Sequence, residues 1–147
     1  MAGIPEVKKF FREAGDINVD KSDIARFRAF VDQKIDDIAV SARDNAHWNN
    51  RDVIAPQDLP ITKGLQERMR EFGKLETAGD MRDWIGQTLR RPPGDVTFGE
   101  ETEDVLTEVF GGLSVGLARS FRIVDPEVSN PNTGHWERAS TLFGLLV

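Results

Sequence analysis

The side chains that could carry out a reaction are few, and they form no known catalytic set. The chain has no cysteine and two histidines, His47 and His135, which are far apart and have no metal-ligand pattern near them. The glycine-rich run 111–116 is followed by Leu117 and Ala118 rather than by Lys and Ser or Thr, so it is not a phosphate-binding loop. No Ser/His/Asp arrangement supports hydrolysis. We therefore expect a protein that is not an enzyme and uses no cofactor and no small-molecule substrate.

One acidic run, Glu100 to Asp104, contains the residue types that bind a divalent cation. Carboxylates also stabilise the first turn of a helix, where unpaired backbone amides carry partial positive charge. Because helical spacing begins at this run, the second interpretation is the simpler one. The sequence thus predicts no metal site.

The chain carries a net charge of −6, from 19 Lys and Arg against 25 Asp and Glu. This balance argues against a protein that holds nucleic acid mainly by neutralising phosphates. A chain of 147 residues can bury one core but not two independent ones. No stretch is apolar over the length that a bilayer requires, and the first residues do not read as a signal peptide. We expect a single domain over residues 1–147, in the cytoplasm and without a membrane partner.

Two long helices must position whatever surface this protein uses. Apolar residues recur at helical spacing from Ile24 to Ala42 and predict a helix over 21–49, with Asp20 as its cap. A second long helix is predicted over 99–121, opened by a capping-box pattern from Thr97 to Glu100. Its three glycines, Gly111, Gly112 and Gly116, weaken a helix unless another backbone approaches closely, so they predict a helix crossing.

Shorter helices flank each long one. Pro5 opens the first, and Gly15 is expected to end it in a left-handed conformation. Helical spacing resumes over 57–72 and again over 81–89. The last helix is expected to turn its apolar residues inward, which are Trp136, Ala139, Leu142, Phe143 and Leu146. The order short helix, long helix, short helix therefore occurs twice.

The segment 42–59, ARDNAHWNNRDVIAPQDL, resembles the end of the central helix of archaeal histones, its following loop and the start of their last helix. Arg51 and Asp58 match the pair that clamps this loop in that family. The whole chain resembles a bacterial double histone-fold family of uncharacterised function. This resemblance implies an all-α protein with two tandem histone folds, at 4–73 and 74–147, packed as an intramolecular pseudodimer. The alternative is a generic six-helix bundle in which Arg51 and Asp58 form an ordinary surface pair.

In such a pseudodimer the first link of one half lies beside the second link of the other. This arrangement would bring Arg90 and Arg91 near Arg51, and Arg119 and Arg122 near the acidic link 16–20. The residues that could then contact duplex DNA are Arg51, Arg90, Arg91, Arg119 and Arg122. The alternative for all five is a solvated face or salt bridges with acidic residues.

Two hypotheses of function follow. The first is a non-enzymatic histone-fold protein that acts as an architectural factor and binds DNA weakly and without regard to sequence. The second is an acidic interaction module that meets a protein partner, or a second copy of itself, and does not bind DNA.

Overall fold

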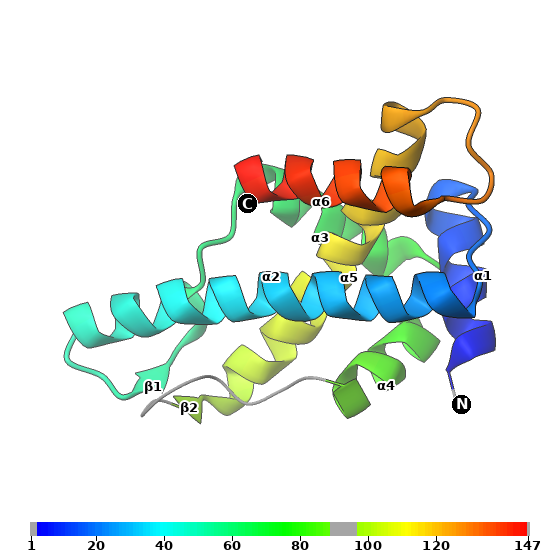
Figure 1. Cartoon of the computed structure of the whole chain (residues 1–147). Helices are drawn as coiled ribbons and strands as arrows, with labels where there is room; N and C mark the ends of the chain where they lie inside the picture. The colour runs from blue at the N-terminus through cyan, green and yellow to red at the C-terminus, as the bar shows by residue number, and fades with distance from the viewer. Residues whose placement is uncertain (1–2, 89–96, 147) are drawn as a thin grey trace.

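The computed structural model describes residues 3–88 and 97–146, and these residues form six α-helices and one very short sheet (Figure 1). The helices are longest at α2 and α5, as predicted. In chain order the elements are α1 (Ile4–Gly15), α2 (Lys21–Trp48), β1 (Val53–Ile54), the 3-10 turn η1 (Pro56–Asp58), α3 (Lys63–Lys74), α4 (Ala78–Thr88), β2 (Thr97–Phe98), α5 (Glu100–Val124) and α6 (Thr133–Leu146). None of the described helices combines the length and the apolar character needed to cross a membrane.

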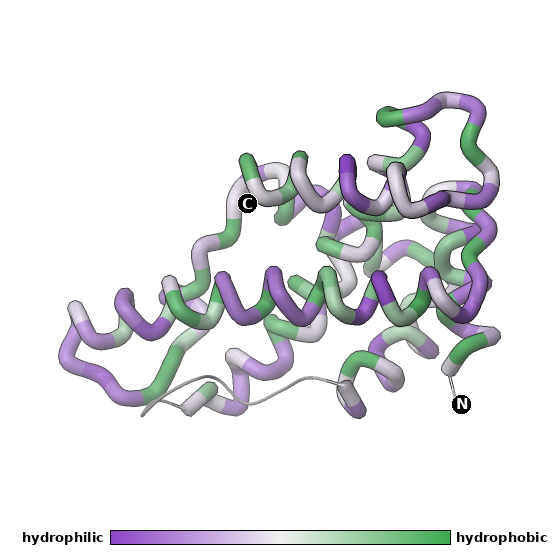
Figure 2. Tube along the Cα trace, in the orientation of Figure 1, coloured by the Kyte–Doolittle hydropathy of each residue, from purple (hydrophilic) through white to green (hydrophobic). Residues whose placement is uncertain are grey.

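The long helix α2 begins with a reciprocal cap between Asp20 and Asp23. The Asp20 carboxylate accepts the Asp23 amide at 2.9 Å, and the Asp23 carboxylate accepts the Asp20 amide at 2.9 Å. These two bonds satisfy amides that the first turn of a helix otherwise leaves unpaired. The predicted start of this helix is therefore confirmed. Along α2, apolar and polar residues alternate around the helix (Figure 2), as expected for a helix with one buried stripe.

The predicted cap of α5 is wrong. Thr97 does not cap this helix, because it pairs with Val53 as part of β2. The residue that precedes α5 is Gly99, and no side chain there bonds to the first amides. A different bond holds the start of this helix. The hydroxyl of Thr102, in the first turn, donates to the backbone oxygen of Ile54 and so connects α5 to β1.

Two predicted helix boundaries are also corrected. The left-handed residue after α1 is Asp16, with φ of 53°, rather than Gly15. A Cβ on Gly15 would lie 2.3 Å from the carbonyl oxygen of Ala118, so this glycine permits close approach of α1 to α5. The helix expected over 57–72 is divided, because the chain is extended around Pro60 and α3 starts only after Thr62.

Helix α2 crosses α5 (Figure 1), and both helices contribute buried side chains to the core. The Phe27 ring of α2 contacts Phe110 of α5, with centroids 6.0 Å apart, and it also contacts Phe11 of α1 at 5.0 Å. Trp84 of α4 stacks on the same ring at 5.8 Å. The Phe27 ring of α2 thus contacts side chains of α1, α4 and α5.

The predicted close approach at the glycines of α5 is present, and the neighbour is α3. A Cβ on Gly111 would lie 2.3 Å from the ring of Phe72, and one on Gly112 would lie 2.7 Å from Met69. Phe72 and Met69, both on α3, fill the space that a side chain larger than glycine would need at these two positions of α5. The glycines therefore allow α3, rather than α2, to pack tightly on α5.

Candidate functional site

The chain segments between the helices meet in two pairs. In the first pair β1 runs parallel to β2, with Val53 opposite Thr97 and Ile54 opposite Phe98. The Gly99 amide extends this ladder by donating to the Ile54 carbonyl at 3.0 Å. The segment after α2 therefore lies beside the segment before α5, as predicted.

Arg51 and Asp58 form the predicted ion pair beside β1. Arg51 donates through Nη1 and Nη2 to the two Asp58 carboxylate oxygens, at 2.6 and 2.7 Å, and through Nη1 also to the Val53 carbonyl at 3.2 Å. The Ala55 amide donates to the same carboxylate at 2.8 Å, and the Asn45 side chain donates to the Asp58 carbonyl at 2.8 Å. The pair thus connects the end of α2, β1 and η1.

Burial separates this pair from an ordinary surface salt bridge. The Asp58 side chain is 2% exposed and the Arg51 side chain is 33% exposed. Hydrogen bonds from Arg51 lower the pKa of Asp58 against the opposing effect of burial. Asp58 therefore stays ionised, and its ion pair with Arg51 holds the loop between α2 and η1.

The second pair of segments joins the residues after α1 to those after α5. The Asn18 amide donates to the Ser129 carbonyl at 2.8 Å. Arg122 donates to the Asp16 backbone oxygen at 2.9 Å and to its carboxylate at 3.2 Å, so the predicted proximity of Arg122 to this link is present. The carboxylate of Asp16 thus offsets the positive charge of Arg122. Arg12 of α1 also reaches this link, where it donates to the Asn18 side chain.

Arg119 is not at this link, contrary to the prediction. It lies three residues before Arg122, on a part of α5 that faces α3, and its Nη1 donates to both carboxylate oxygens of Glu71, at 2.7 and 2.8 Å. Arg68 pairs with the same Glu71 at 3.0 Å. The predicted sites at Arg90 and Arg91 lie outside the described residues. Each of the three described candidates, Arg51, Arg119 and Arg122, therefore binds a carboxylate.

His135 serves as a structural cap. Its Nδ1 accepts the Asn132 amide at 2.9 Å, while the Asn132 side-chain oxygen accepts the His135 amide at 3.1 Å. Nε2 then faces the Asp125 carboxylate at 3.0 Å, and this bond from His135 lowers the pKa of Asp125. The ring thus joins the end of α5 to the start of α6. His47 lies in the last turn of α2, far from this cap in the sequence.

The acidic run at 100–104 forms the first turn of α5, with Glu100, Glu101 and Glu103 at its start. Within residues 3–88 and 97–146, no three His, Asp or Glu side chains gather closely enough to hold a metal ion. The three glutamates thus lie where carboxylates stabilise the first turn of a helix.

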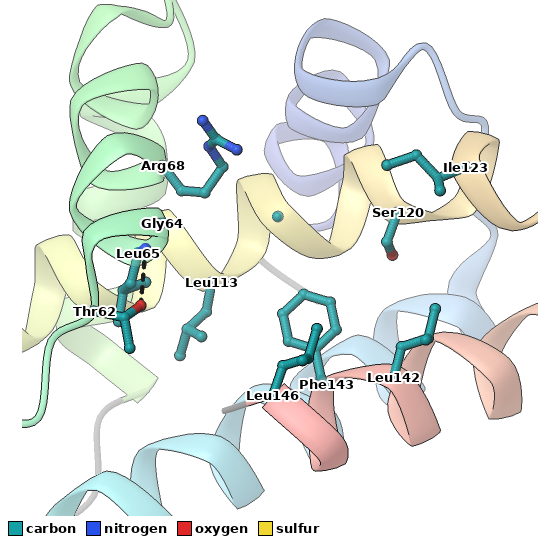
Figure 3. Close-up of a pocket in the computed structure, with 12 residues that line it drawn as sticks. Thr62, Gly64, Leu65, Arg68, Leu113, Ser120, Ile123, Leu142, Phe143 and Leu146 are labelled. Atoms are coloured by element: carbon teal, nitrogen blue, oxygen red, sulfur yellow. Dashed lines mark hydrogen bonds between the residues drawn. The ribbon is translucent and has the colours of Figure 1, made fainter.

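An apolar groove of about 510 Å³ lies between α3, α5 and α6 (Figure 3). Its apolar walls come from Leu65 of α3, Leu113 of α5 and Phe143 of α6, among others, and among the described residues Arg68 is the one charged residue that lines it. The sequence did not predict this groove. Leu142 and Leu146 were expected to face the core, but both are exposed, because they line this open groove rather than the closed core.

A second apolar feature lies at the far end of α2. Trp48 ends this helix with 84% of its surface exposed, and Val53 of β1 is also exposed. The loop that joins them is the one held by Arg51 and Asp58. Tryptophan is enriched among the residues that contribute most to contacts between proteins.

The chain as a whole is similar to several known proteins. Residues 7–144 match a protein family described as a domain of unknown function, DUF1931. A crystal structure of a protein from Thermus thermophilus superposes with a TM-score of 0.86 at 38% identity and covers 97% of each chain. A crystal structure of an Aquifex aeolicus protein superposes with a TM-score of 0.82 at 25% identity, over 99% of this chain and 95% of the other.

A curated relative from Aquifex aeolicus strain VF5, described as an uncharacterized protein, is 29% identical over 111 residues. This match covers 76% of the present chain and 65% of the relative, so it spans less than two thirds of the relative's length. The arrangement of helices therefore recurs in proteins of Thermus thermophilus and Aquifex aeolicus, together with part of the sequence.

Proposed function

This chain belongs to the DUF1931 family, a family of unknown function, and from that premise we propose that it is a single-chain pair of histone folds acting as a protein-interaction module. The partner in this proposal is a protein rather than DNA. Catalysis has no part in it.

The order and pairing of the elements support the histone-fold part of the proposal. A short, a long and a short helix occur as α1, α2 and α3 and again as α4, α5 and α6. The link after each long helix pairs with the link before the other, at Val53 with Thr97 and at Asn18 with Ser129. Such reciprocal pairing is what two interlocked copies of one unit produce. We therefore assign residues 4–73 and 74–147 to the two units.

One observation carries the choice of a protein partner. Each of the three described arginines that the sequence had suggested for phosphate contact is bound to a carboxylate: Arg51 to Asp58, Arg119 to Glu71 and Arg122 to Asp16. Binding a phosphate through these groups requires breaking an existing ion pair, and the net charge of −6 adds long-range repulsion. These arginines thus contribute little to phosphate binding, whereas the apolar groove and the exposed Trp48 provide apolar surface that a protein can contact.

Weak DNA binding is the second candidate, and the position of Arg51 favours it. This residue lies beside the paired strands β1 and β2 and keeps a third of its side chain exposed. If Arg51, Arg90 and Arg91 each neutralise one phosphate, the logarithm of the binding constant falls against the logarithm of salt concentration with a slope of about −3. Binding of this kind is weak at physiological salt.

A titration of labelled duplex DNA separates the two candidates. The purified chain is added to a fluorescent duplex of about 30 base pairs at about 20 mM and about 150 mM salt, and anisotropy is measured. We expect no binding at about 150 mM salt up to about 50 μM protein. A Kd below about 1 μM at that salt concentration would overturn the interaction-module proposal. In that case the double variant Arg90→Ala, Arg91→Ala is expected to remove roughly two units of the salt slope without unfolding the protein.

A further inference from the structure

The ring of His135 lies at the start of α6, and its two nitrogens have different partners. Nδ1 accepts the Asn132 amide at 2.9 Å, and Nε2 lies 3.0 Å from a carboxylate oxygen of Asp125. The His135 side chain is 11% exposed, so these two partners, rather than water, decide where the ring carries its proton.

The neutral ring fits this position in one tautomer. A backbone amide can donate but not accept, so Nδ1 has to offer its lone pair to Asn132 and carries no proton. The proton of the neutral ring is therefore on Nε2, which donates it to Asp125. In this tautomer the ring satisfies both partners at once.

Asn132 and His135 together form a reciprocal helix cap. The Asn132 side-chain oxygen accepts the His135 amide at 3.1 Å, while Nδ1 of His135 accepts the Asn132 amide. In the usual form of this cap, the second residue is a glutamate or a glutamine. An imidazole takes that place here, and imidazole is the side chain that ordinarily changes its charge between about pH 5 and about pH 8.

A proton added to the ring has to enter at Nδ1, because Nε2 already carries one. A protonated Nδ1 is a donor, so it no longer accepts the Asn132 amide, and two N–H groups then face each other. The bond from Nε2 to Asp125 is kept, since the carboxylate attracts the charged ring. Protonation thus breaks one side of the cap and leaves the other contact of the ring in place.

The other charged groups around this cap have partners of their own. Arg138 of α6 acts on Asp125 and lowers the pKa of that carboxyl. From α2, Asp23 accepts the Trp136 indole N–H at 2.9 Å, and Arg26 donates to a threonine hydroxyl in the first turn of α6 at 2.9 Å. Neither of these α2 bonds involves the imidazole ring.

We propose that the start of α6 is a pH-dependent cap, which is closed while His135 is neutral and opens when its Nδ1 takes up a proton. In the open state the Asn132 amide has no acceptor, so the first turn of α6 frays more often. Trp136, which joins α6 to Asp23 of α2, is the next residue after His135. Acid therefore loosens the anchored end of a helix that also forms one wall of the groove.

NMR of the full chain, with ¹⁵N-labelled histidine, tests the tautomer. At about pH 8 we expect an unprotonated Nδ1 and a protonated Nε2 in His135, and a scalar coupling between Nδ1 and the Asn132 amide nitrogen across their hydrogen bond. A ring that carries its proton on Nδ1 at this pH would overturn the proposal.

Hydrogen exchange of the Asn132 and His135 amides tests the opening. Protection is compared between about pH 8 and about pH 5.5, after correction for the intrinsic pH dependence of exchange. It is expected to fall about fivefold in acid, which is the effect of losing a typical cap on the stability of a helix end. Protection that stays constant over this range would contradict the proposal.

His135→Gln separates the cap from other effects of acid. Glutamine can accept the Asn132 amide as in an ordinary capping box and does not titrate, so this variant should show equal protection at both pH values. His47→Gln is the matched control, because it removes the other of the two histidines and should retain the fivefold fall.

An equal fall in His135→Gln, or no fall in His47→Gln, would assign the acid response to another group and overturn the proposal. If His135→Gln does not fold, the original chain and His47→Gln still decide, together with the tautomer measurement. These experiments use neither DNA nor a partner protein, so their outcome is independent of the proposed function.

Discussion

Trp136 donates its indole N–H to the carboxylate of Asp23 at 2.9 Å, and these residues are 113 positions apart in the chain. Both side chains are buried. Asp23 is also the residue whose other carboxylate oxygen caps the start of α2. A single carboxylate therefore fixes the beginning of α2 and joins it to α6.

Replacing Trp136 by Phe is expected to destabilise the protein by about 1–3 kcal/mol. The phenyl ring keeps most of the apolar contact, but it leaves a buried oxygen of Asp23 without its donor. Urea unfolding followed by circular dichroism measures the change. Trp48→Phe is the control, because Trp48 is exposed, and its unfolding free energy should match that of the original chain.

Removing the Asp58 carboxylate is expected to be equally damaging. Asp58→Ala removes the acceptor for Arg51 and for the Ala55 amide, at a cost of about 2 kcal/mol. Arg51→Lys is expected to retain part of this stability, since an ammonium group replaces two parallel hydrogen bonds with one point contact. The same urea experiment checks both variants. If Asp58→Ala leaves the unfolding midpoint unchanged, the pair has no part in holding the loop.

Two glycine substitutions are expected to have opposite signs. Gly111→Ala places a methyl group against the fully buried Phe72 ring and should destabilise the protein by about 1–3 kcal/mol. Gly86 lies at an exposed position of α4, where an added Cβ would meet no side chain and no other element within 4 Å. Gly86→Ala should therefore stabilise the protein by up to about 1 kcal/mol, because alanine favours the helix. Thermal unfolding of both variants compares the two signs. Equal effects would contradict the tight packing of α3 on α5.

Stability is expected to fall in acid. Hydrogen bonds from Arg51 lower the pKa of Asp58, and a hydrogen bond from His135 lowers that of Asp125. The folded protein therefore binds protons at these groups less readily than the unfolded chain does. Their contribution is complete above the ordinary aspartate pKa of about 4, and it is lost as the pH falls through the lower pKa values of the folded state. Urea unfolding between about pH 7 and about pH 2.5 measures this dependence, and Asp58→Asn should make it shallower.

The sequence predicted the long helices because their signals are local. The apolar spacing from Ile24 to Ala42 and the carboxylate of Asp20 define α2 without reference to any other element. The ion pair of Arg51 and Asp58 was expected from the resemblance of segment 42–59 to archaeal histones, and its partners are also close in the chain. Such features depend on residues within one or two helical turns of each other.

The features that the sequence did not reveal depend on distant neighbours. Thr97 has the side chain of a helix cap, but pairing with Val53 draws it into a strand. Leu142 and Leu146 have helical spacing typical of core residues, and whether they are buried depends on how closely α3 and α5 approach α6. The groove is therefore a property of the assembled helices, and no single segment predicts it.

The bond between Asp23 and Trp136 can form only late in synthesis. Asp23 leaves the ribosome first, and its donor follows 113 residues later. At a synthesis rate of about 5–20 residues per second, the start of α2 waits on the order of 6–20 s for α6 to emerge. During that interval α2 lacks the cover that Phe143 of α6 gives to Phe30 in the folded chain.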